Sequence, residues 1–166
     1  MMSQESLALL LRSVNLTLCA MHYQEVTDQA EGEGWNLTRY LRHLVEMEIE
    51  ARRLRKIERI LKASHLPSGK TLATLDLSRF SAKVRRQVPT LCEGHFLERS
   101  ENILAFGLPG RGKTHLVSAI GHELVQKGHS VLFTPAYRLV QNLLTAKRDL
   151  ALEREMRRLY RFEAVI

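Results

Sequence analysis

Eight consecutive residues constrain the fold of this chain more than any other feature. The stretch 107–114, read Gly-Leu-Pro-Gly-Arg-Gly-Lys-Thr, matches the pattern G-x-x-x-x-G-K-[ST] of a phosphate-binding loop. The apolar run 102–106 before it predicts a buried strand, and residues 114–127 after it have the apolar spacing of a helix. A glycine loop between a strand and a helix gathers backbone N–H groups at the positive end of the helix dipole. The motif therefore predicts an anion site within an α/β fold.

The residue types in this loop predict a nucleotide site. Glycines let the backbone turn tightly and approach phosphate oxygens, the lysine supplies a flexible positive charge for the β- and γ-phosphates, and the threonine offers a hydroxyl to Mg²⁺. Arg111 is expected to face solvent. The predicted nucleotide-binding residues are Gly107, Leu108, Pro109, Gly110, Arg111, Gly112, Lys113, Thr114 and His115, with Thr114 as the predicted metal ligand.

Hydrolysis requires more than this loop. A Walker B carboxylate normally follows a second hydrophobic strand and supports the magnesium ion. No acid after the loop is placed in this way, and no catalytic residue is predicted; the acids in question are Glu123, Asp149, Glu153, Glu155 and Glu163. The run 162–166 reads as the strand that should present such a carboxylate. The expectation is an ATPase core that lacks its Walker B acid and later elements.

The remainder of the chain predicts three parts. Residues 1–65 form a helical, basic N-terminal domain, with helices over 1–35 and 37–63 and a turn at 31–34, and Asn36 is suited to cap the second helix. Residues 66–99 form a linker with short helices over 72–80 and 84–96. Residues 100–166 form a partial P-loop ATPase core.

Within this core, strands alternate with helices. A second strand is predicted at 130–133, with Gly128 ending the helix before it. Thr134 is suited to cap the next helix with Pro135 at its first position, and that helix runs to about residue 146. A charged helix follows at 150–160. Together these elements predict the opening of a parallel sheet with flanking helices and one unpaired edge.

The charge of the chain predicts an acidic partner. The net charge is +7 and the sequence pI is about 9.8. Basic residues gather on one face of the 37–63 helix: Arg52, Arg53, Arg55, Lys56, Arg59 and Lys62. Glu48 can pair with Arg52, and Glu58 with Lys62, at i,i+4 spacing. The face is predicted to contact the phosphate backbone of DNA without sequence preference, and a solvated helix surface is the alternative.

Localisation follows from what the sequence does not contain. No signal peptide is recognised, no apolar stretch approaches the length of a membrane span, and Cys19 and Cys92 are isolated. The protein is expected to be cytoplasmic, with no membrane partner.

The segment 101–116, ENILAFGLPGRGKTHL, resembles the core of the IstB-like ATP-binding proteins, transposition helpers related to the DnaC helicase loaders and DnaA initiators. Features at 40–48, 52–53, 62–77, 128–131 and 139–146 also fit this family. The resemblance implies an AAA+-like fold, ATP and Mg²⁺ as cofactors, DNA binding, a partner transposase and a homo-oligomer. Leu108 replaces the family's usual proline and Arg111 a small residue. The family continues through an acidic pair after residue 166, so a C-terminally truncated copy is expected.

Three other functions compete with this one. A DnaC-like helicase loader shares the loop and differs in its partner. A non-enzymatic remnant that binds DNA or transposase agrees with the lack of a Walker B acid. A small-molecule kinase is disfavoured, because about a hundred mostly helical, basic residues precede the loop.

Overall fold

The computed structural model describes residues 4–166 and separates the chain into two compact units, residues 1–56 and 57–166. The division falls inside one long helix, α3 (Leu37–Ser64). Each unit is described by itself below. The three-part organisation proposed from the sequence stays a prediction.

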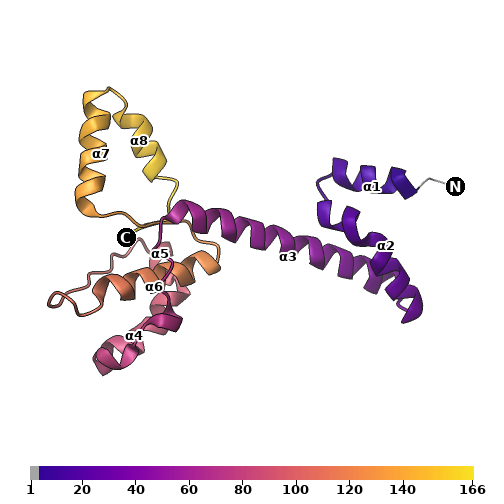
Figure 1. Cartoon of the computed structure of the whole chain (residues 1–166), viewed down its shortest axis with the longest axis horizontal. Coiled ribbons are helices and arrows are strands. Elements are labelled where there is room, and N and C mark those ends of the chain that lie inside the picture. Colours follow the sequence, from indigo (N-terminus) through magenta and orange to yellow (C-terminus); the bar gives the residue numbers. More distant parts are fainter. Residues whose placement is uncertain (1–3) are drawn as a thin grey trace. The chain divides into compact units, whose positions relative to one another are not determined.

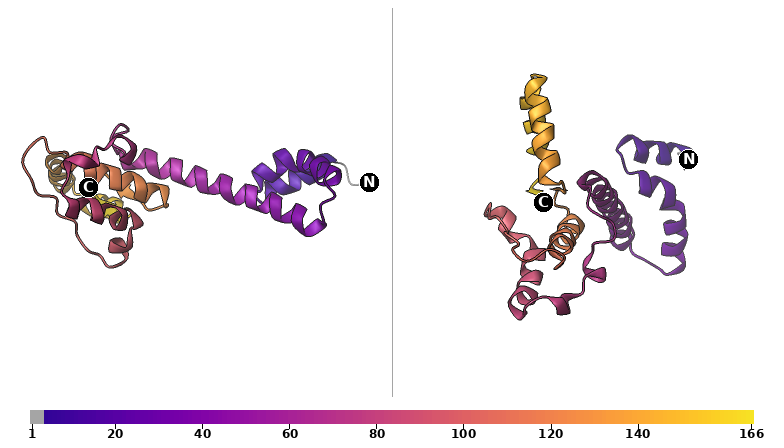
Figure 2. Two further views of the ribbon diagram at one scale, coloured as in Figure 1. Left: turned by 90° about the horizontal axis from the view of Figure 1, so that it is seen from below. Right: turned by 60° about the vertical axis from the view of Figure 1, so that its left-hand side comes forward.

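The N-terminal unit is helical. It contains α1 (Gln4–Ser13), α2 (Thr17–Gly32) and the first half of α3, and α1 and α2 lie alongside α3 (Figures 1 and 2). Cys19, Val26 and Leu44 form its small core. Asn36 caps α3 as predicted, because its Oδ1 accepts a hydrogen bond from the Arg39 backbone N–H at 2.8 Å. The helix predicted over 1–35 is interrupted, because residues 14–16 separate α1 from α2 and Asn15 has a φ of 62°.

The second unit is built around α6 (Lys113–Gln126) (Figure 1). Two short 3₁₀ turns, η1 (Leu72–Thr74) and η2 (Leu77–Arg79), precede α4 (Ala82–Glu93) and α5 (His95–Glu98). Leu124 and Val125 of α6 are fully buried, and the core around them includes Ile57, Val88 and Val131. The apolar side of α6 thus anchors the helix whose N-terminus carries the loop.

A small parallel sheet completes this unit and makes it an α/β structure. Strand β1 (Val131–Leu132) pairs with β2 (Ala164–Val165) in the register Val131↔Ala164 and Leu132↔Val165. Helices α7 (Ala136–Arg148) and α8 (Leu152–Leu159) form the crossover between the two strands. Parallel strands joined through helices are the arrangement predicted from the sequence.

The end of α6 and the start of α7 were both predicted from the sequence, and the structure confirms the first and corrects the second. Gly128 ends α6 as predicted: its N–H donates to Val125 O at 2.9 Å, and the His129 N–H donates to Leu124 O at 3.0 Å. The predicted start of α7 was wrong by one position. Pro135 is the N-cap itself, and the Thr134 N–H donates to Ile166 O at 2.8 Å. Thr134 therefore bonds to the residue that follows β2 rather than capping the helix.

The strand predicted at 102–106 is the main correction to the fold. Residues 101–108 have no regular secondary structure, and Leu104 and Phe106 are 74% and 86% exposed. A strand needs a neighbour to complete its backbone hydrogen bonds, and β1 pairs with β2 instead. The three-stranded sheet is thus reduced to two strands in the described residues.

None of the helices within residues 4–166 combines the length and the apolar character needed to span a membrane.

Candidate functional site

The glycine loop lies directly before α6 and leaves the helix N-terminus without a side-chain cap. Gly110 and Gly112 have φ angles of 73° and 84°, in the left-handed region that favours glycine. Gly112 is the N-cap of α6 and offers no side chain to the first N–H groups of the helix. These N–H groups and the helix dipole remain available to an anion.

Lys113 closes over the loop that precedes it. Its ammonium donates hydrogen bonds to Gly107 O at 2.8 Å and Leu108 O at 2.9 Å. These bonds place a positive charge at the loop carbonyls, beside the uncapped helix end. The side chain is therefore positioned to bind phosphate oxygens after releasing the two carbonyls.

The other predicted ligand residues are accessible. The side chains of Thr114 and Arg111 are exposed, and Arg111 faces solvent as expected. The Thr114 hydroxyl can serve as one ligand to a nucleotide-bound Mg²⁺. Among residues 4–166 no cluster of three or more histidine, cysteine or acidic side chains is arranged to hold a metal ion alone. The donors present, the loop and helix N–H groups with the Lys113 ammonium, are suited to a phosphate anion.

Residues 67–80, which we call the α6 collar, pack against the start of α6, and the sequence analysis did not predict this contact. His115 Nε2 lies 3.2 Å from Thr71 O and 3.1 Å from Thr74 Oγ1. The Phe80 ring lies so close that a Cβ at Gly112 would meet its Cζ at 3.1 Å. His115, which stays a predicted nucleotide-binding residue, thus also connects α6 to the collar.

The acids after the loop form local interactions. Asp149, Glu153 and Glu155 pair with arginines on or beside their own helices. Glu123 lies within α6. No hydrogen bond or ion pair joins any of the five acids to the glycine loop within the described part of the chain.

Glu163 bridges the two strands, a link the sequence analysis missed. Its Oε2 lies 2.5 Å from His129 Nδ1, and its Oε1 accepts from the Ser130 N–H and hydroxyl at 3.3 Å each. Burial would raise the pKa of Glu163, but the hydrogen bonds from His129 and Ser130 outweigh it and lower the pKa below its usual value. This carboxylate therefore ties the start of β2 to the start of β1.

The basic residues of α3 divide into two groups. Arg52 and Arg55 both bind Glu48, at 3.0 Å and 3.2 Å, and Arg53 binds Glu50. The Glu48–Arg52 pair was predicted correctly. Among the described residues no ion pair forms between Glu58 and Lys62, so that prediction was wrong. Within α3, the lysine and arginine side chains that have no acidic partner among the described residues are Lys56, Arg59 and Lys62, all exposed.

The burial of Glu48 explains why both Arg52 and Arg55 pair with it. Its carboxylate is only 2% exposed and accepts the Leu18 and Cys19 backbone N–H groups, at 2.7 Å and 3.3 Å. Burial would raise the pKa of Glu48, but Arg52 and the two N–H groups hold the pKa below its usual value. Arg52 and Arg55 thus have a structural role in addition to any surface role.

Comparison with known proteins agrees with this geometry. The family model described as "IstB-like ATP binding protein" matches residues 9–166. A putative insertion sequence ATP-binding protein of Sinorhizobium fredii is 38% identical over 161 residues, 96% of this chain and 54% of that protein. The IS21 putative ATP-binding protein of Pseudomonas aeruginosa is 36% identical, over 92% of this chain and 58% of its own length.

A more distant relative is the replicative helicase loader DnaC of Buchnera aphidicola, 31% identical over 59% of this chain and 41% of that protein. This chain spans little more than half the length of the insertion sequence relatives. With a match over nearly its whole length and a glycine loop at an uncapped helix end, the chain belongs to the IstB-like ATP-binding protein family.

Proposed function

We propose that this chain binds ATP with Mg²⁺ in an AAA+-like P-loop core and serves as a helper of insertion sequence transposition, together with the element's transposase. The observation that carries the proposal is the uncapped start of α6, with Lys113 held over the glycine loop. Two relatives above are named as ATP-binding proteins of insertion sequences. Loop N–H groups and Lys113 would hold the phosphates, and Thr114 would face the metal.

A titration with Mg²⁺·ATP tests nucleotide binding. The intact chain is expected to bind saturably, and Lys113→Ala to weaken binding about a hundredfold, the range of lost charge-assisted hydrogen bonds. Lys127→Ala is the matched control, because this lysine is exposed at the other end of α6. Equal affinity of the Lys113→Ala and unchanged chains would refute the site.

Binding and turnover are separate properties here. No carboxylate of the described residues forms a hydrogen bond or ion pair with the loop, so we expect slow or absent ATP hydrolysis by this chain on its own. Phosphate release measured at saturating ATP tests this expectation. Rapid turnover that disappears in Lys113→Ala would show that an acid from another chain or another conformation completes the site.

DNA binding is proposed for the unpaired cations of α3. Lys56, Arg59 and Lys62 recur every three residues, so they lie within one sector of the helix. Replacing all three with alanine should weaken duplex binding and lower the slope of log affinity against log salt by about 2.7, as expected for three phosphate contacts. Fluorescence anisotropy with a labelled duplex measures both quantities.

The matched control removes three arginines that already bind acids. Arg42, Arg99 and Arg157 pair with Glu46, Glu101 and Glu153. Their triple alanine variant changes the net charge by the same amount and should leave the salt slope nearly unchanged. An equal loss in both variants would reduce the proposal to a general charge effect.

A helicase loader is the second candidate, favoured by the match to DnaC of Buchnera aphidicola. The two functions share the nucleotide loop and differ in the protein bound. Pull-down of the purified chain against a transposase and a replicative helicase decides between them. Retention of the helicase alone would favour the loader. If the chain retains neither protein, binds DNA in a salt-sensitive way and does not bind nucleotide, the non-enzymatic DNA-binding remnant would be favoured.

A further inference from the structure

Helix α4 carries its charges against its own dipole. Lys83, Arg85 and Arg86, which we call the α4 cations, lie within the first five residues of the helix, and its one acid, Glu93, is the last residue. Cations near a helix N-terminus and an acid at its C-terminus are both unfavourable. Helix α8 shows the favourable order, with glutamates in its first turn and arginines in its last. The order in α4 therefore lowers the stability of the helix.

No acid in the described part of the chain neutralises the α4 cations. All three side chains are exposed, and within residues 4–166 no ion pair involves any of them. Asp76, which precedes α4, accepts hydrogen bonds from Ser78. The pKa of Cys92 is raised by burial first and by the charge of Glu123 second, so Glu123 lies near the far end of α4. The repulsion among the three cations thus remains uncompensated.

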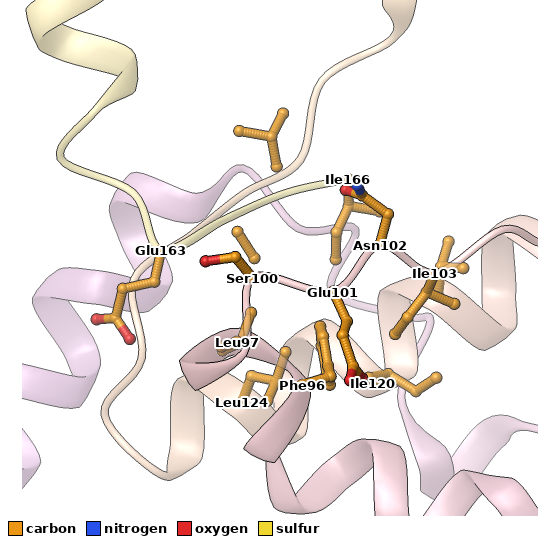
Figure 3. Close-up of a pocket in the computed structure, with 13 residues that line it drawn as sticks. Phe96, Leu97, Ser100, Glu101, Asn102, Ile103, Ile120, Leu124, Glu163 and Ile166 are labelled. Atoms are coloured by element: carbon orange, nitrogen blue, oxygen red, sulfur yellow. The ribbon is translucent and has the colours of Figure 1, made fainter.

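Packing against α6 fixes which side of α4 is buried. Val88 and Cys92 of α4 belong to the same core as Leu124 of α6. Helix α5, which follows α4 directly, places Phe96 and Leu97 beside Leu124 as well (Figure 3). With its apolar side held in this core, α4 presents the three cations to solvent as one basic surface.

The chemistry of this surface favours a polyanion. Ser81 already caps α4, because its Oγ accepts the Val84 N–H at 3.4 Å, so the free groups are charged side chains rather than backbone N–H groups. Over Ala82–Glu93, all of which the structure describes, no large apolar side chain is exposed. The surface therefore lacks the apolar anchor that a protein or a membrane would bury. Separate flexible cations of this kind suit a row of phosphates.

We propose that the α4 cations bind the phosphate backbone of duplex DNA, as a contact separate from Lys56, Arg59 and Lys62 of α3. The inference takes its ligand from the DNA binding proposed above and rests on that proposal. Bound phosphates supply the negative charge that α4 lacks at its N-terminal end, so the order of charges that weakens the free helix favours the complex.

Replacing all three α4 cations with glutamine removes their charges and keeps long side chains of similar helix propensity. In the full chain this variant should lower the slope of log DNA affinity against log salt by about 2.7, as expected for three lost phosphate contacts. Without DNA its thermal unfolding midpoint should rise, because the unfavourable charges near the helix N-terminus are gone. The matched control, Arg85→Lys with Arg86→Lys, keeps the charges and should keep the slope.

Acetylation of lysines in the unchanged chain tests the contact without any substitution. Lys83 should react several-fold more slowly when duplex DNA is bound, whereas Lys127, exposed at the far end of α6, should react at the same rate. Equal protection of both lysines, or of neither, would contradict the proposal.

Two comparisons separate this inference from the DNA binding proposed for α3. An unchanged salt slope in the glutamine variant, with the expected fall when Lys56, Arg59 and Lys62 are replaced, would overturn the inference and leave DNA binding by α3 in place. If neither slope fell, both proposals would be wrong. A lower unfolding midpoint in the glutamine variant would give the α4 cations a structural role, and a loss of Mg²⁺·ATP affinity with an unchanged DNA slope would assign them to the nucleotide. Either result contradicts the proposal.

Discussion

The first backbone N–H groups of a helix have no partner within the helix, and the starts of α2 and α6 differ in what they offer to these groups. At the start of α2, the Leu18 and Cys19 N–H groups donate to the buried carboxylate of Glu48. At the start of α6, the N-cap is Gly112, which offers no side chain. The first helix end supplies its own anion, and the second remains available to an external one.

This difference separates a structural anion site from a binding site. Glu48 is neutralised by Arg52 and Arg55 and is nearly inaccessible, so its interactions stabilise the N-terminal unit. The cation at the start of α6 is Lys113, and within residues 4–166 its ammonium binds the loop carbonyls of Gly107 and Leu108 alone. Substitutions at the two sites should therefore affect different properties.

The largest expected effect is on stability at the α2 site. Glu48→Ala leaves the buried Cys19 N–H and the part-buried Leu18 N–H unsatisfied, and should lower the free energy of unfolding of the N-terminal unit by about 3 kcal/mol. Urea unfolding followed by the fluorescence of Trp35, the single tryptophan, measures it. Glu50→Ala is the control, since Glu50 is an exposed partner of Arg53 alone. If Glu48→Ala and Glu50→Ala lowered the free energy of unfolding by similar amounts, Glu48 would have no special structural role at the start of α2.

A second substitution tests the α6 site. Gly112→Ala puts a side chain at a φ of 84° and 3.1 Å from Phe80, and should cost about 1–2 kcal/mol of stability in the second unit as well as weakening nucleotide binding. Thermal unfolding and ATP titration measure the two effects. Gly32→Ala, which meets nothing within 4 Å and lies in α2, should be neutral or stabilising. If Gly112→Ala changed neither the thermal stability nor the ATP affinity, Gly112 would not have the left-handed backbone and the close approach to Phe80 described above.

Acid should weaken the α2 site selectively. The pKa of Glu48 is lowered in the folded chain, so its stabilisation is complete above the unfolded pKa of about 4.3 and is lost as pH falls through the lower folded value. The urea midpoint from Trp35 should therefore fall between pH 6 and pH 3. Glu48→Gln should show a smaller fall over this range. Parallel pH profiles of the two proteins would assign the acid sensitivity to other groups.

The smallest effect is expected at the α6 collar. Thr74→Val removes the hydroxyl that lies 3.1 Å from His115 Nε2 and should cost about 1 kcal/mol or less. Because His115 keeps its contact to Thr71 O, ATP affinity should change only slightly. Calorimetric ATP titration of Thr74→Val and Thr74→Ser checks this. A large loss of affinity in the valine variant alone would give the collar a direct part in nucleotide binding.

Local signals predicted most of the helices and the glycine loop before α6, but not the break at residues 14–16 that separates α1 from α2. Asn36 and Gly128 act within one turn of their own helix ends, so their roles can be inferred from neighbouring residues. The strand expected at 102–106 needs a distant neighbour, which apolar composition alone does not reveal. Glu48 was predicted to bind Arg52, but its bonds to Leu18 and Cys19 span about 30 residues and have no sequence signal.

The hydrogen bonds of Lys113 to Gly107 and Leu108 also set a threshold for what can occupy the loop. A ligand must compensate the two interactions that the ammonium gives up. A nucleoside brings no negative charge and offers nothing in exchange, whereas a polyphosphate does. Discrimination between them is thus built partly into the loop itself, through the two carbonyl bonds of Lys113.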